Sequence, residues 1–139
     1  MKTTGALIRI ARAAALMTLA MAGALAGPAR AAGVGGVWTG AAREGAGKTY
    51  LFKLTLWSES EGVVDYTDLK CRSLVKAMPR ADARRVFRET VVEGKFGGQC
   101  DDGFFELSPF GAQLKWVWSA SPGGAMIASG TLTRVAAAP

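Results

Sequence analysis

The segment TYLFKLTLW, residues 49–57, carries the strongest structural signal in the chain. Its apolar side chains recur at every second position, at Tyr50, Phe52, Leu54 and Leu56. Lys53 and Thr55 lie between them. Because successive side chains of a β-strand point to opposite faces, this period predicts a strand with one buried face. A polar turn at residues 58–62 is followed by Val63 to Tyr66, which begins a return strand, so the two runs predict a hairpin.

Similar short runs fill the remainder of the chain after residue 32. They are separated by glycine, proline and aspartate, the residues that favour turns. The runs lie at residues 37–38, 72–77, 84–93, 103–107, 113–119 and 125–134. We therefore expect an all-β domain at residues 32–139, with about eight strands in a single antiparallel up-and-down barrel or a strongly curved sheet.

The N-terminus has the composition of an export signal. Basic residues come first, then a short alanine-rich apolar run, then small residues: Lys2, Arg9 and Arg12, residues 13–26, and residues 28–32. This order is typical of a secretory signal peptide. We expect a helical signal peptide at residues 1–31, cleaved near Ala31, and a periplasmic or secreted mature protein. A membrane span needs about 20 apolar residues, so we expect no stable membrane anchor after cleavage; an uncleaved anchor is the alternative.

Cleavage would change the charge of the protein. The whole chain carries 17 basic and 11 acidic residues, but four of the basic residues and none of the acidic ones lie in residues 1–31. The mature part then has 13 basic and 11 acidic residues, a net charge of +2. Nucleic-acid-binding domains are usually strongly basic, so we expect no nucleic-acid partner.

The residue types present restrict the chemistry. The chain contains no histidine, which removes histidine-based catalytic triads and imidazole metal sites. We expect a protein that is not an enzyme, with no metal and no cofactor. Cys71 and Cys100 are the two cysteines, and in an exported domain they most simply form a disulfide. A reactive thiol or a metal ligand is the alternative.

Residues 42–49, AREGAGKT, resemble a phosphate-binding loop in which alanine replaces the first glycine. A working loop of this kind is followed by a helix whose N-terminus holds the phosphates. Here a predicted strand follows, so we interpret the glycines as a turn and expect no nucleotide.

Three pairs of acidic residues are candidates for acid–base chemistry: Asp65 with Asp68, Asp101 with Asp102, and Glu89 with Glu93. Such catalysis requires two carboxyl groups held at a fixed separation across a cleft. We interpret all three pairs as turns or solvated surface. A calcium site at Asp101 and Asp102 is the alternative for that pair.

Tryptophans and arginines are the candidates for ligand or partner contact. Trp116 and Trp118 share a predicted strand face, as core or as an aromatic lining, and Trp57 lies at a predicted strand end where it can be exposed. Arg84, Arg85 and Arg88 belong to the densest basic stretch, either a solvated strand face or a patch for an acidic partner.

Gly36-Val37-Trp38 opens the first strand and Arg134 lies in the last one. This pair resembles the G-x-W motif and late arginine of lipocalin-like (calycin) barrels. The resemblance implies that Trp38 packs across one barrel end and that Arg134 lies over its ring in a cation–π contact.

A second pattern runs through Tyr66-x-x-Leu69-x-Cys71, Glu89, Gly98-x-Cys100 and Gly130-x-Leu132-x-Arg134. It resembles small bacterial exported β domains, most of which have no known function. The resemblance implies that the two cysteines pair.

Together these features favour an exported, non-enzymatic binding module that recognises a small ligand or an extracytoplasmic protein. One alternative is an inhibitor of a secreted protease or other hydrolase, with residues 33–36 or 43–48 as the inhibitory segment. Another is a small enzyme acting on cell wall or sugar, which would need two acidic residues converging in a pocket.

Overall fold

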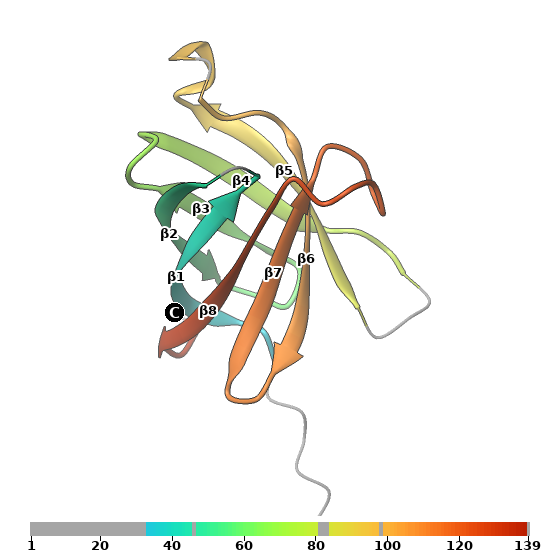
Figure 1. Ribbon diagram of the computed structural model, residues 1–139. Coiled ribbons are helices and arrows are strands. Elements are labelled where there is room, and N and C mark those ends of the chain that lie inside the picture. Colours follow the sequence, from blue (N-terminus) through green and yellow to red (C-terminus); the bar gives the residue numbers. More distant parts are fainter. Residues whose placement is uncertain (1–32, 46, 81–83, 98, 139) are drawn as a thin grey trace, which may run out of the picture. The chain divides into compact units, whose positions relative to one another are not determined.

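The structure is a computed structural model that describes residues 33–45, 47–80, 84–97 and 99–138. Its described part forms a closed antiparallel barrel of eight strands without an α-helix (Figure 1). The elements are β1 (Gly36–Glu44), β2 (Lys48–Leu56), β3 (Glu61–Tyr66), β4 (Cys71–Ala77), β5 (Arg85–Glu93), the short 3₁₀ helix η1 (Lys95–Gly97), β6 (Gly103–Phe110), β7 (Gln113–Ser119) and β8 (Ala128–Ala136). The predicted all-β barrel is confirmed. The expected signal peptide lies outside the described residues.

Each strand pairs with its neighbours in sequence, and β8 returns to pair with β1. In this up-and-down order every connection joins two adjacent antiparallel strands, so no crossover is needed. Closure also leaves no sheet edge free to pair with another chain. No helix in the described part of the chain is long and apolar enough to cross a membrane.

Three strand boundaries differ from the sequence prediction by about three residues or more. The expected break at Ser108-Pro109 is wrong, because β6 continues to Phe110 and Pro109 lies opposite Leu114. Pro109 is exposed near the end of the strand, where a missing N–H is tolerated. β1 extends to Glu44, well beyond the two residues expected. β8 begins at Ala128 rather than at residue 125, because residues 120–127 form an exposed connection.

Aromatic side chains fill the middle of the barrel. Phe52, Phe87, Phe105 and Trp116 are almost fully buried. The ring centroids of Phe52 and Trp116 are 4.8 Å apart, and those of Phe87 and Phe105 are 5.1 Å apart. The centre is therefore a packed core, so an internal ligand site has to lie towards one end.

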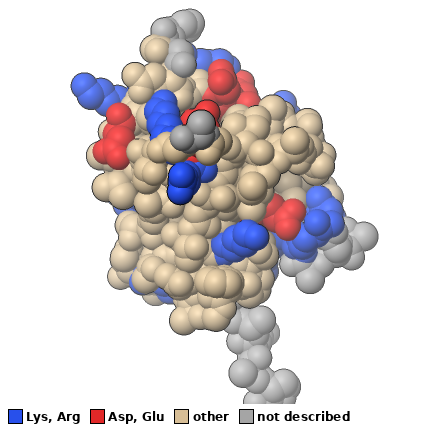
Figure 2. Space-filling model, in the orientation of Figure 1, with Lys and Arg blue, Asp and Glu red and all other residues tan. Residues whose placement is uncertain are grey.

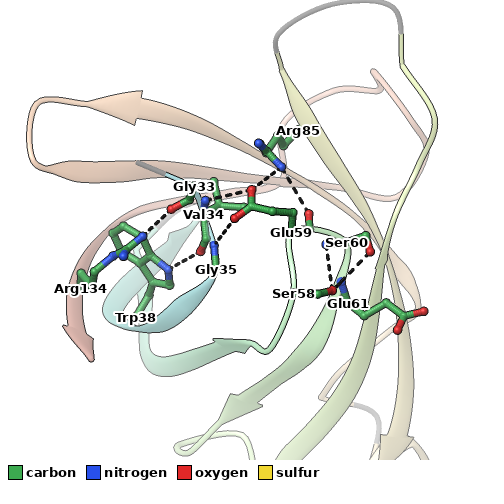
Figure 3. A network of polar contacts seen from close by, with 10 residues as sticks. All are labelled: Gly33, Val34, Gly35, Trp38, Ser58, Glu59, Ser60, Glu61, Arg85 and Arg134. Carbon is green, nitrogen blue, oxygen red and sulfur yellow. Dashed lines mark hydrogen bonds and ion pairs between the residues drawn. The ribbon is translucent and has the colours of Figure 1, made fainter. Parts of the chain in front are cut away.

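One end of the barrel is closed by the segment of residues 33–38. Trp38 is buried there and its indole N–H donates to the Val34 carbonyl at 2.7 Å. The Arg134 guanidinium lies 4.5 Å from the centroid of the Trp38 ring and also donates to the Gly33 carbonyl (Figure 3). This is the arrangement that the lipocalin-like resemblance implies.

Glu59, in the turn between β2 and β3, holds the same segment in place. Its carboxylate accepts hydrogen bonds from the N–H groups of Val34, at 3.2 Å, and Gly35, at 3.0 Å (Figure 3). Arg85 of β5 forms an ion pair with this carboxylate at 2.7 Å. At the closed end, residues 33–35 are thus held by the β2–β3 turn and by β8, and this turn is held by β5.

The opposite, open end carries the β1–β2, β3–β4, β5–β6 and β7–β8 connections; in Figure 1 the β5–β6 connection with η1 stands at the top. A disulfide crosses this end from Cys71, at the start of β4, to Cys100, in the β5–β6 connection. The Cα atoms of the two cysteines are 6.4 Å apart. The predicted pairing is confirmed.

Candidate functional site

A pocket of about 420 Å³ opens at the disulfide-bearing end of the barrel. Residues from six strands and from three of the connections at this end surround it. Three aromatic and four acidic residues dominate its lining, and the remainder are apolar or neutral: Tyr50, Tyr66 and Trp118; Glu44, Glu89, Asp101 and Asp102; Leu69, Gln99, Cys100, Ala120, Ile127 and Ala128.

Glu89 is the most deeply placed charged group, with only 1% of its surface exposed. The Tyr66 hydroxyl and the Trp118 indole N–H each donate a hydrogen bond to its Oε2 atom at 3.0 Å. These donors come from β3 and β7, so three strands of the barrel meet at one carboxyl group. Hydrogen bonds of this kind offset part of the cost of burying a carboxylate.

Burial shifts the protonation of this group. Removal from water raises the pKa of Glu89 from its ordinary value of 4.5 to about 7, although the hydrogen-bonding neighbours act in the opposite direction. The buried Ser73 hydroxyl also favours the ionised form, but makes no hydrogen bond of ordinary geometry. Asp102 raises the pKa slightly further by charge repulsion. Glu89 can therefore exchange a proton near neutral pH.

The pKa values of the two pocket tyrosines, Tyr50 and Tyr66, are raised by the same burial and negative charge. Burial, followed by the negative charges of Glu44 and Glu89, raises the pKa of Tyr50 to about 12. Burial and Glu89 also raise the pKa of Tyr66 well above its usual value. A new negative charge in this pocket is thus disfavoured.

Gly103 on β6 makes room for the indole of Trp118. Gly103 lies directly opposite Glu89 in the β5–β6 ladder. A Cβ atom at Gly103 would lie only 2.2 Å from Cζ2 of Trp118. The absence of a side chain at this position therefore lets the indole lie against the sheet and reach the carboxyl group.

Asp102 organises the rim of the pocket. Its carboxylate accepts hydrogen bonds from the Val91 N–H at 2.8 Å and from the Lys95 ammonium at 2.7 Å. The Lys95 and Val91 hydrogen bonds lower the pKa of Asp102. The prediction that Asp102 belongs to a turn agrees with this position before β6, since its contacts fix the β5–β6 connection.

The three tryptophans predicted as candidates for ligand contact lie in three different parts of the barrel. Trp118 lines the pocket. Trp116 is completely buried in the central core and packs against Phe52 and Phe105. Trp57 follows β2 at the closed end and is 45% exposed, so it lies far along the barrel from the pocket.

The arginines of the basic stretch do not line the pocket. Arg85 binds Glu59 at the closed end, and Arg84 lies 3.7 Å from the Glu106 carboxylate. Arg88 is exposed on β5. Figure 2 shows basic and acidic side chains interspersed on the visible face, without a single large basic area.

The interpretation of Glu89 as solvated surface is wrong. Within β5, Glu89 points into the barrel like Phe87 and Val91, two residues away on either side, and all three side chains are buried. The same alternation is visible in the sequence and could have placed Glu89 inside the barrel. Its former pair member, Glu93, is exposed at the end of the strand.

Two other sequence motifs also have defined positions. The phosphate-loop pattern at residues 42–49 spans the end of β1, a turn and the start of β2, so no helix follows it.

Among the described residues there is no group of three or more cysteine, aspartate or glutamate side chains placed to hold a metal ion.

No family model matches the chain, and no curated protein or solved structure is significantly similar to it. The candidate site is therefore defined by its own geometry.

Proposed function

We propose that the protein is an exported, lipocalin-like binding module that holds a small molecule in the open-end pocket. The observation that carries this proposal is the pocket itself, an open cup of about 420 Å³ above a packed core. Ligand sites in proteins are typically concave, with a few placed polar groups among apolar and aromatic walls. Tyr50, Trp118 and Glu89 supply such groups here.

Export is part of the same proposal. The composition of residues 1–31 favours a signal peptide, and the Cys71–Cys100 disulfide suits an oxidising compartment. The contact of Arg134 with Trp38 at the closed end supports the lipocalin-like assignment. A binding role in the periplasm or outside the cell follows from these features together.

Native mass spectrometry of the mature protein, purified gently from the exported fraction, tests the binding role. We expect a discrete additional mass of a few hundred daltons, as suits a pocket of this size. Ala128 lines the pocket, whereas Ala41 is exposed on the outer surface of β1. Ala128→Leu should lose the additional mass and Ala41→Leu should keep it. A protein without bound ligand in all three samples would contradict the proposal.

Inhibition of a hydrolase draws less support from the structure. Residues 33–35 are bound to Glu59 and Arg134 rather than protruding. Residues 43–44 and 48–49 are paired in the β1–β2 ladder, which leaves a short hairpin turn. A substrate-like inhibitory segment would need a longer exposed loop at one of these places.

A sugar- or cell-wall-acting enzyme is the second candidate, because Glu89 and Asp101 line one pocket. A carboxyl group with a pKa of about 7 suits a general acid. Incubation with peptidoglycan and with polysaccharides, followed by mass spectrometry of the soluble products, tests it. Turnover that Glu89→Gln abolishes would replace the binding proposal with this one.

A further inference from the structure

The charges that line the pocket have one sign. Four of its lining residues are acidic and none is lysine or arginine. Asp102 is paired with Lys95, whereas Glu44 and Glu89 have no ion-pair partner among the described residues. An unpaired negative field in a concave site attracts cations.

The two carboxyl oxygens of Glu89 differ in the hydrogen bonds that they accept. Both of its hydrogen bonds of ordinary geometry reach Oε2; the Ser73 hydroxyl also favours the ionised carboxyl group but forms no such bond. The groups that face it from β3, β4 and β7 are the hydroxyls of Tyr66 and Ser73 and the indole of Trp118, with Asp102 at the rim. None of these is a cation. A buried carboxylate without a cationic partner is costly, so a ligand cation would find strong electrostatic complementarity at Oε1.

The aromatic walls suit the same kind of ligand. Tyr66 and Trp118 contact the carboxyl group and Tyr50 lines the same pocket, and aromatic faces attract ammonium groups through their quadrupoles. Leu69, Ile127 and Ala128 provide an apolar wall at the same pocket. Burial, followed by the charges of Glu44 and Glu89, raises the pKa of Tyr50, so an anionic ligand would meet both desolvation and charge repulsion here.

We propose that the ligand of this pocket is a small organic amine, bound as an ammonium ion against the Glu89 carboxylate with its apolar body against Leu69 and Ile127. This inference rests on the proposed binding function and specifies the class of molecule bound. The ammonium group donates to Oε1 of Glu89, which leaves the Tyr66 and Trp118 hydrogen bonds to Oε2 intact. The aromatic rings then cover the remaining surface of the cation.

Three probes of similar size and different charge test the proposal: phenylpropylamine, phenylpropanol and phenylpropionate. Each is titrated into the mature wild-type protein and followed by the NMR resonance of the Trp118 indole N–H, which is assigned with a Trp118→Phe variant. We expect phenylpropylamine to bind at least about tenfold more tightly than phenylpropanol, the gain typical of a charge-assisted hydrogen bond. We expect phenylpropionate to bind most weakly.

Two variants identify the group responsible. Glu89→Gln removes the buried charge, and Glu93→Gln makes the same chemical change at the exposed end of the same strand. We expect Glu89→Gln to lose about tenfold in affinity for phenylpropylamine, and its affinity for phenylpropanol to change by less than about twofold. Glu93→Gln should bind both probes as the wild type does.

The possible failures can be told apart. If phenylpropanol or phenylpropionate binds as tightly as phenylpropylamine, the pocket binds ligands but the amine assignment is wrong. Unchanged amine affinity in a folded Glu89→Gln protein also overturns it. If none of the three probes shifts the Trp118 resonance, the amine assignment is wrong, and the native mass spectrum of the exported protein then decides whether the pocket binds another ligand. Should Glu89→Gln fail to fold, the ranking of the three probes on the wild type decides the proposal.

Discussion

Glu89 lies between Phe87 and Val91 on the inward face of β5, so the strand that fills the barrel centre also carries a carboxyl group into its open end. Its two hydrogen-bond donors, Tyr66 and Trp118, come from strands that are not neighbours of β5. Only barrel closure brings these side chains together. A single residue therefore links the packed core to the chemistry of the pocket.

The raised pKa of Glu89 predicts a specific dependence of stability on pH. The folded state holds the proton up to pH about 7, whereas an unfolded glutamate releases it near its ordinary value of 4.5. The folded protein thus binds more protons between these values, and its free energy of unfolding should fall as pH rises through this window. The loss should approach about 3 kcal/mol and level off above pH about 7.

Urea unfolding at a series of pH values measures this dependence, with Glu89→Gln as the variant and Glu93→Gln as its control. The slope between pH about 4.5 and 7 should disappear in Glu89→Gln and persist in Glu93→Gln. The lowered pKa of Asp102 acts at lower pH, where stability falls as that carboxylate gains its proton. Equal slopes in all three proteins would show that Glu89 does not titrate in this window.

Gly103 is the second residue on which the pocket depends, because a Cβ atom there would overlap Trp118. Gly103→Ala should displace the indole, break its hydrogen bond to Glu89 and destabilise the protein by about 1–3 kcal/mol. Gly97→Ala is the control, since a Cβ atom at Gly97 meets nothing within 4 Å. The Trp118 indole N–H resonance should move in the first variant only; an unmoved resonance in Gly103→Ala would contradict this account.

At the scale of elements, the strands whose apolar residues alternate clearly could be predicted from sequence. β2 alternates strongly, and its expected limits differ from the observed ones by one residue at each end. β1 was expected to be short because its second half, from Thr39 to Glu44, consists of small and charged residues that carry little apolar signal. Its pairing with both β2 and β8 sets its length, and such long-range pairing leaves little trace in local composition.

The plug formed by Trp38 of β1 and Arg134 of β8 should carry much of the stability of the closed end. Trp38→Ala removes a buried indole, its hydrogen bond to Val34 and its contact with Arg134. We expect the free energy of unfolding to fall by about 3–5 kcal/mol. Trp38→Phe should recover part of this loss. A decrease below about 1 kcal/mol for Trp38→Ala would show that the plug is not structural.

The disulfide joins β4 to the β5–β6 connection over 29 residues. Closing a loop of this length is worth about 3–4 kcal/mol in the chain-entropy model. Cys71→Ala should therefore lower the free energy of unfolding by several kcal/mol, and reduction of the wild type should have a similar effect. Identical unfolding midpoints for oxidised and reduced protein would contradict the pairing.

At the scale of the whole molecule, the barrel has one end closed by backbone and side-chain contacts and one end open over a charged pocket. The sequence predicted the barrel, the disulfide and a place for Trp118 on the inward face of β7. It did not predict the pocket, because Glu44, Glu89 and Asp101 are far apart in sequence and meet only when the barrel closes. The packed layer of Phe52, Phe105 and Trp116 separates the two ends.

This separation predicts that the two ends respond independently to mutation. Glu59→Gln weakens the hold on Val34 and Gly35 and removes the ion pair with Arg85. Because the Glu59 side chain is half exposed, the free energy of unfolding of Glu59→Gln should be only about 1 kcal/mol below that of the wild type. The Trp118 resonance and the affinity for phenylpropylamine should stay unchanged, whereas Gly103→Ala should alter both. A Glu59→Gln protein with altered ligand affinity would mean that the core transmits changes between the ends, since no contact of Glu59 reaches the pocket lining.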